Sequence, residues 1–295
     1  MLLKEHLPGS LGDVRTVILA ISEDAKRIRG GFIGRQGSAG TKNVYGETQL
    51  EMDKWADELI VDDLKELPCV ASIASEERDD LVKCSPNGKI SVTLDPLDGS
   101  SLMGVNLSVG TIVGIFRAKD PLRPGSELAA AMYVLYGPLT TLVYTAGHGV
   151  HEFALDGSGE YVLQMEDIKI GSGKIYAPGA LRPKWLGPHR RFIERLEEKG
   201  YKLRFCGSFV ADAHQILHKG GIFTYPAYQG GEDGKLRLLF EANPIGFIIM
   251  NAGGETSNGR TGILSMKPAK LDQRVPVYVG GREEISMLHE EMNRE

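Results

Sequence analysis

Residues 94–101 bring together side chains that could bind a metal ion and a phosphate group. Asp95 and Asp98 flank a Pro-Leu pair, and Pro96 cannot donate a hydrogen bond to a sheet. We therefore expect the alternating strand over 89–94 to end at Asp95 and the chain to turn. Carboxylate and carbonyl oxygens on one side of a turn suit Mg²⁺ or Mn²⁺, and the Gly-Ser-Ser that follows offers backbone N–H groups to a phosphate. An ordinary capped turn has the same composition, so the motif alone leaves both interpretations open.

A second pair of acids, Glu76 and Glu77, follows a short apolar run over 69–74 that predicts a buried strand. If this strand neighbours the one that ends at Asp95, the pair joins Asp95 and Asp98 in a cluster of four carboxylates. Such a cluster repels itself and is hard to explain without cations. The alternative is a solvated acidic surface.

Glu241 is an isolated acid beside the apolar residues 238–240, shortly after the basic residues Lys235 and Arg237. An acid in such a run tends to be paired, bound to metal or placed at the mouth of a site. A satisfied surface acid is the alternative.

His214 and His218 lie four residues apart, which is the spacing of a zinc-binding pair on a helix. The sequence HQILH lacks the glutamate of the HExxH motif. We therefore do not expect a metal site from this spacing.

The glycine-rich stretch 30–46 predicts a mobile loop, either an active-site lid or a flexible connector. Thr48 to Glu51 matches a capping box, and apolar residues at helical spacing then run to Pro68. Asp53 thus falls in the first turn of a helix. It either complements the helix dipole or reaches the metals when the loop closes.

Composition excludes several classes of protein. A chain of 295 residues with 42% hydrophobic and 25% charged residues is ordinary globular material, and a net charge of -5 provides no basic surface for nucleic acid. Three cysteines without paired spacing indicate neither disulfides nor a zinc site. We see no membrane-spanning run and no secretory signal, so we expect a cytoplasmic protein that has no membrane partner.

Hydrophobic periodicity predicts an N-terminal helix, capped by Ser10 and ended by Gly30-Gly31, and a β-rich block over 108–155. A change of composition at 171–173 suggests a domain boundary. Beyond it, helices alternate with strands, which argues for a second α/β layer. The expected elements there are helices at 190–198, 208–218, within 240–252 and at 283–292, and strands near 203 and at 222–225.

Several motifs carry a resemblance to a known family and occur in that family's order: AGTKNVYGE, SEE, DPLDGSS, SVGTIVGIFRA, GSFVADAH, GGIFTYPA, GKLRLLFEANP and AGGETS. On these motifs the chain resembles the class I fructose-1,6-bisphosphatases, which belong to the lithium-sensitive, metal-dependent sugar and inositol phosphatases. DPLDGSS indicates only the larger group. GGIFTYPA together with GKLRLLFE is much more specific to the bisphosphatases.

The resemblance assigns roles to individual residues. It implies two or three Mg²⁺ ions (or Mn²⁺) per subunit, held by Glu76, Glu77, Asp95, the carbonyl of Leu97, Asp98 and Glu241. It implies catalytic roles for Glu47, Asp53 and Glu77, of which Glu47 and Asp53 would activate the attacking water when the loop closes. It implies substrate binding by Gly99, Ser100, Tyr176, Arg204, Tyr225 and Lys235, with Arg204 reaching a neighbouring subunit's site.

The resemblance also implies a layered α/β (α+β) sandwich with two subdomains. Residues 1–170 would bind metal and phosphate, and residues 171–295 would bind the sugar phosphate. The implied activity is hydrolysis of the 1-phosphate of fructose 1,6-bisphosphate, in gluconeogenesis or sugar-phosphate cycling, by a cytoplasmic homotetramer.

Three departures from the family pattern keep other activities open. Phe205-Cys206 stands where the family has a tyrosine, and Gly179 stands where it has an asparagine near the retained phosphate. Neither the N-terminus nor Ile90 matches the family's AMP site, so we do not expect AMP inhibition. The alternatives are a broad inositol or sugar monophosphatase, sedoheptulose-1,7-bisphosphatase activity, and a non-enzymatic sugar-phosphate-binding regulator.

Overall fold

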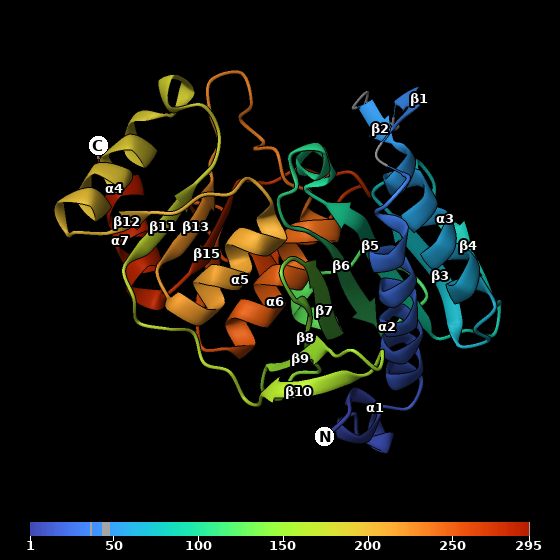
Figure 1. The fold of residues 1–295 in the computed structure, drawn as a ribbon. Coiled ribbons are helices and arrows are strands. Elements are labelled where there is room, and N and C mark those ends of the chain that lie inside the picture. The colour runs from blue at the N-terminus through green and yellow to red at the C-terminus, as the bar shows by residue number, and fades with distance from the viewer. Residues whose placement is uncertain (36, 43–47, 295) are drawn as a thin grey trace.

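The computed structural model describes residues 1–35, 37–42 and 48–294. Within this part of the chain, two large sheets and three pairs of helices alternate to form a layered α/β sandwich (Figure 1). The predicted fold class is confirmed. No helix in the described ranges is both long and apolar enough to cross a membrane.

The first sheet has eight strands in the order β10-β9-β8-β7-β6-β5-β3-β4. Their bounds are β3 Val70–Ser75, β4 Val82–Lys83, β5 Ile90–Asp98, β6 Val109–Phe116, β7 Leu128–Tyr136, β8 Thr140–Thr145, β9 His151–Leu155 and β10 Tyr161–Met165. The central strands β5 and β6 are buried along their whole length, because helices cover both faces of the sheet. β3 runs parallel to β5, so the condition for a cluster of four carboxylates, that these two strands are neighbours, is met.

The second sheet has five strands in the order β12-β11-β13-β15-β14. Their bounds are β11 Ile175–Pro178, β12 Lys202–Leu203, β13 Ile222–Tyr225, β14 Glu255–Ser257 and β15 Val277–Gly280. β12 and β13 lie where strands are predicted, whereas β11, β14 and β15 are not predicted. All five strands are only two to four residues long, which is too short for a reliable periodic signal.

The helices are α1 Leu3–His6, α2 Asp13–Gly31, α3 Glu51–Lys65, α4 Gly187–Glu198, α5 Phe209–Lys219, α6 Asn243–Asn251 and α7 Arg282–Met292. Apolar faces of α2 and α3 pack on the outer face of the first sheet. Residues of α5 and α6 form the core between the two sheets. Those of α4 and α7 cover the far face of the second sheet (Figure 1).

The N-terminal helices begin elsewhere than predicted. Gly12, not Ser10, precedes the first turn of α2, since Ser10 lies in a short 3₁₀ turn. Thr48 belongs to strand β2, Thr48–Leu50, which pairs with β1, Ser38–Lys42, and α3 begins at Glu51. The described part of the expected loop therefore contains a strand, β1, which is paired with the residues just before α3.

Pro96 does not end its strand. β5 continues to Asp98, with an irregular register between Asp95 and Asp98 opposite β6. An irregularity of this kind tolerates a residue that lacks an N–H, and the Pro96 carbonyl accepts a hydrogen bond from Thr111 Oγ1 at 2.9 Å. Both aspartates therefore remain fixed to the sheet.

Candidate active site

A cavity of about 470 Å³ opens where β3 and β5 end. Because the two strands are parallel, Glu76, which directly follows β3, lies beside Asp95 of β5, and the Glu76 N–H donates to the Leu94 carbonyl at 2.9 Å. The predicted site residues in the cavity wall are Asp53, Glu76, Glu77, Asp95, Leu97, Asp98, Gly99, Ser100, Tyr225, Lys235 and Glu241. Segments almost 200 residues apart in sequence thus meet at one place.

Carboxylates of Glu76, Asp95 and Glu241 form the centre of this cavity, with ligand oxygens that all lie within 4.8 Å of one another. Asp95 and Glu241 are only 6% and 4% exposed. Burial raises the pKa of Asp95 well above its usual value, and the nearby Glu76, Asp98, Glu241 and Glu77 raise it further. A set of buried oxygens that repel one another fits a divalent cation, whose charge would remove this repulsion.

Helix α3 fixes the turn that carries Glu76 and Glu77. Asp57 Oδ1 accepts a hydrogen bond from Ser75 Oγ at 2.6 Å, and its Oδ2 accepts one from Arg78 Nε at 2.7 Å. The two bonds lie on either side of the glutamate pair. Asp57 therefore positions both glutamates relative to the sheet.

The first turn of α5 fixes Asp98. Its Oδ2 accepts hydrogen bonds from Ser208 Oγ at 2.7 Å and from the Val210 N–H at 2.8 Å. Burial raises the pKa of Asp98, while the bonds to Val210 and Ser208 lower it. Since both bonds fall on Oδ2, the other oxygen, Oδ1, is the atom we expect to face a ligand. Ser208 is not among the predicted site residues, although its position as the first residue of the predicted helix 208–218 is a usable signal.

The close approach of Ser208 to Asp98 also requires a glycine at position 99. Its φ is +78°, a conformation that favours glycine, and a Cβ at this position would lie 2.7 Å from Ser208 Cβ. The turn at Gly99 is followed by a 3₁₀ helix, Ser100–Val105. A left-handed residue before right-handed turns directs successive N–H groups to one side, as in known anion-binding loops.

Arg237 places a positive charge inside the acidic cluster. This residue is 2% exposed, and its Nη1 lies 3.5 Å from Glu76 Oε1. Its backbone N–H donates to Glu241 Oε2 at 2.6 Å across a π-helical turn, Leu238–Ala242. The sequence marks Arg237 as basic but does not predict this position, because a π turn has no periodic signature at this length.

Tyr225 and Lys235 lie together in the wall of the cavity. Lys235 Nζ is 6.0 Å from the centroid of the Tyr225 ring, within the range of a cation–π contact. Burial raises the pKa of the Tyr225 hydroxyl, which therefore remains protonated at neutral pH. The pair offers a cation and a hydroxyl to a polar ligand.

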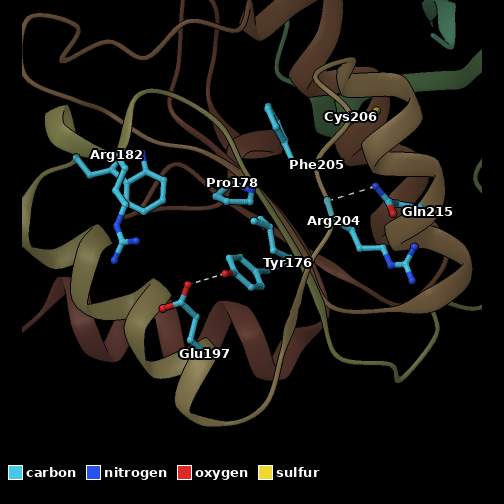
Figure 2. A pocket seen from close by; sticks show the side chains of 10 residues that line it. Tyr176, Pro178, Arg182, Glu197, Arg204, Phe205, Cys206 and Gln215 are labelled. Atoms are coloured by element: carbon cyan, nitrogen blue, oxygen red, sulfur yellow. Dashed lines mark hydrogen bonds between the residues drawn. The ribbon is translucent and has the colours of Figure 1, made fainter.

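Tyr176 and Arg204 lie in a separate cavity of about 760 Å³, and Phe205 lines both cavities. The Tyr176 hydroxyl donates to Glu197 Oε1 at 2.6 Å, and Figure 2 shows the Arg204 guanidinium extending away from Tyr176. The structure thus does not bring these two residues together with the carboxylates. Glu47 lies outside the described residues.

Family models match almost the whole chain. Residues 4–166 match the N-terminal domain of fructose-1,6-bisphosphatase, and residues 170–293 match its C-terminal domain. The chain belongs to the fructose-1,6-bisphosphatase family.

Individual relatives give the same assignment. A class 1 fructose-1,6-bisphosphatase of Methanocorpusculum labreanum is 49% identical over 283 residues, which cover 96% of this chain and 87% of that protein. A class 1 fructose-1,6-bisphosphatase of Citrifermentans bemidjiense is 52% identical over an alignment that covers 85% of this chain and 78% of that protein. The holo crystal structure of Leishmania major fructose-1,6-bisphosphatase aligns with a TM-score of 0.93 at 30% identity, over 100% of this chain and 99% of that one. The suspected class I relationship is confirmed.

Proposed function

We propose that this enzyme hydrolyses the 1-phosphate of fructose 1,6-bisphosphate to give fructose 6-phosphate and inorganic phosphate. The observation that carries the proposal is one cavity that combines a buried carboxylate cluster, a turn suited to phosphate and the Tyr225–Lys235 pair. Membership of the family supports the same reaction.

The carboxylate cluster fits Mg²⁺, or Mn²⁺, because its donors are hard oxygens whose mutual repulsion a cation relieves. Glu76, Glu77, Asp95, Asp98 and Glu241, with the Leu97 carbonyl, would hold two or three ions. When bound, such ions stabilise charge on the phosphate and the leaving oxygen and lower the pKa of a water molecule.

The remaining groups bind and orient the substrate. Backbone N–H groups at Gly99 and Ser100 would hold the phosphate that is cleaved, since the left-handed turn at Gly99 directs them into the cavity. Lys235 would neutralise the retained phosphate, and the protonated Tyr225 hydroxyl would donate to it or to the sugar. Positioning and charge stabilisation are the main demands of phosphoryl transfer.

Glu77 and Asp53 would accept the proton of the attacking water. Both line the cavity, and Asp53 lies in the first turn of α3. Glu47, four residues before this helix, would join them by resemblance to the family. Removal of either described carboxylate should lower kcat more than it changes KM, because the water is activated only in the reaction step.

We also propose a cytoplasmic homotetramer in which residues 1–170 and 171–295 divide the metal and sugar sites. The position of Arg204 outside the carboxylate cavity suits a contribution to a neighbouring subunit's site.

A broad monophosphatase is the second candidate. Two observations favour it: the Tyr176 hydroxyl is bonded to Glu197, and a Cβ at Gly179 would lie 2.3 Å from Tyr225 Cδ2. An asparagine therefore does not fit at Gly179 unless Tyr225 moves. The contacts to the retained phosphate thus differ from the family pattern.

Phosphate release separates the candidates. In Mg²⁺ we expect one phosphate per fructose 1,6-bisphosphate, no release in EDTA, and much slower release from inositol 1-phosphate. Equal or faster release from inositol 1-phosphate would replace the bisphosphatase proposal with the monophosphatase. Sedoheptulose 1,7-bisphosphate, assayed in parallel, measures how far the sugar pocket accepts a longer chain. Binding without release of phosphate from any of these substrates would instead support a regulator.

A further inference from the structure

A second group of possible metal ligands lies between β9 and α5, outside the active site. Glu152 from β9 and His214 and His218 from α5 place one ligand atom each within 4.8 Å of the others. His218 Nε2 is 2.6 Å from Glu152 Oε2, and the two imidazole centroids are 4.5 Å apart. The histidine spacing alone does not predict a metal site, but the strand supplies the missing carboxylate.

Tyr133 orients the more buried histidine. Its Oη lies 2.8 Å from His214 Nδ1, which leaves Nε2 as the ring atom for a metal. Metal-binding histidines commonly use their second nitrogen in this way.

A comparable trio, His6, His151 and Glu166, serves as an internal comparison. There, His6 Nδ1 and Nε2 contact Tyr144 Oη and Glu166 Oε1 at 2.6 and 3.3 Å. His151 Nε2 and Nδ1 contact the His148 carbonyl and the Asp167 N–H at 3.2 and 3.3 Å. Groups outside the trio thus engage His6 Nδ1 and both ring nitrogens of His151, and the remaining ligand, Glu166, is exposed. This trio is therefore the poorer candidate.

We propose that Glu152, His214 and His218 bind one Zn²⁺ ion. Two neutral imidazoles and one carboxylate form a three-ligand set that zinc uses in proteins, with water in the fourth position. Mg²⁺ prefers oxygen ligands and does not compete well for imidazole. Binding through His218 Nε2 would replace its contact with Glu152 Oε2, and the neutral ring would then carry its proton on Nδ1.

The site is open to solvent and separate from the catalytic carboxylates. The side chains of His218 and Glu152 are 21% and 13% exposed, which gives an ion access. His218 lies near the end of α5, about 15 Å along the helix axis from Ser208. Since Ser208 holds Asp98, the ion would tie the helix that supports the active site to the first sheet.

Calorimetric titration of Zn²⁺ into the metal-stripped protein, with excess Mg²⁺ to fill the oxygen sites, tests the proposal. We expect one Zn²⁺ per chain in the wild type and in the matched control His151→Ala. Affinity should fall by at least about tenfold in His218→Ala, Glu152→Gln and the orienting variant Tyr133→Phe. Co²⁺ should give a visible absorption band typical of tetrahedral ligands, and His218→Ala should abolish it.

Two results would overturn the proposal. One is unchanged Zn²⁺ binding in both His218→Ala and Glu152→Gln, with far-UV circular dichroism showing that each variant is folded. The other is loss of the Zn²⁺ in His151→Ala or in the active-site variant Asp95→Asn, with binding retained in His218→Ala.

Discussion

Replacement of Ser208 by alanine tests how α5 supports the active site. The Ser208 hydroxyl is fully buried, donates to Asp98 Oδ2 at 2.7 Å and accepts from the Ala211 N–H at 3.4 Å. A hydrogen bond to a charged group contributes about 1.5–3 kcal/mol, and loss of a helix cap costs about 1 kcal/mol. Ser208→Ala should therefore lower the free energy of unfolding by about 2–4 kcal/mol.

The same substitution should weaken metal binding, because the Asp98 carboxylate is then held by the Val210 N–H alone. Loss of a group that orients a metal ligand typically costs about 10- to 100-fold in affinity or activity. We expect the Mg²⁺ concentration for half-maximal phosphate release to rise by about tenfold or more. Urea unfolding in EDTA and Mg²⁺ titration of turnover measure the two effects.

Ser257→Ala is the matched control. Ser257 is also fully buried, and its hydroxyl contacts His289 Nε2 and the Gly259 N–H at 2.8 and 2.9 Å, away from the cavity. This variant should lose stability without any change in the Mg²⁺ requirement. The reasoning is refuted if Ser208→Ala leaves the Mg²⁺ requirement unchanged, or if Ser257→Ala changes it equally.

Three further substitutions probe other parts of the account. Glu241→Gln removes one of several carboxylates that repel one another, so it should stabilise the protein in EDTA by about 1–2 kcal/mol. The variant should also gain less stability from Mg²⁺ than the wild type does. A calorimetric scan in EDTA in which the variant is less stable than the wild type would contradict this prediction. Gly99→Ala should lower the free energy of unfolding by about 1–2 kcal/mol because of the φ of +78°, and further because of the contact with Ser208. Its kcat should also fall. A variant that unfolds in urea and turns over substrate as the wild type does would refute this prediction. Burial raises the pKa of Asp24 to about 8, so the native state binds this proton more tightly than the unfolded state, and wild-type stability should fall as pH rises from about 4 to about 8. Asp24→Asn should reduce this pH-dependent loss of stability by up to about 5 kcal/mol. If the wild type and the variant lose stability equally as pH rises, Asp24 is not the group responsible.

The acidic cluster was predictable because most of its carboxylates lie in short motifs at or near the end of a predicted strand. Glu76 and Asp95 come from two strands whose apolar runs indicate burial, and the structure places those strands side by side. The sequence does not reveal what holds the ligands. Ser208 meets Asp98 across 110 residues, through packing of a helix that no local pattern specifies.

Other differences have the same origin in tertiary structure. Pro96 remains in its strand because the register with β6 is irregular there. The His214–His218 spacing is visible in the sequence, but Glu152 joins it only when β9 packs beside α5. Tyr176 lies in a second cavity for a similar reason, since its hydroxyl is bonded to Glu197 of α4.

The most direct test of the central claim follows fructose 1,6-bisphosphate by ³¹P NMR in Mg²⁺ with the wild type and with Asp98→Asn. The wild type should remove the 1-phosphate resonance, yield one inorganic phosphate and retain the 6-phosphate. Asp98→Asn, folded by circular dichroism, should leave both sugar phosphates largely intact. Near-normal turnover by Asp98→Asn, or initial loss of the 6-phosphate, would contradict the proposed site.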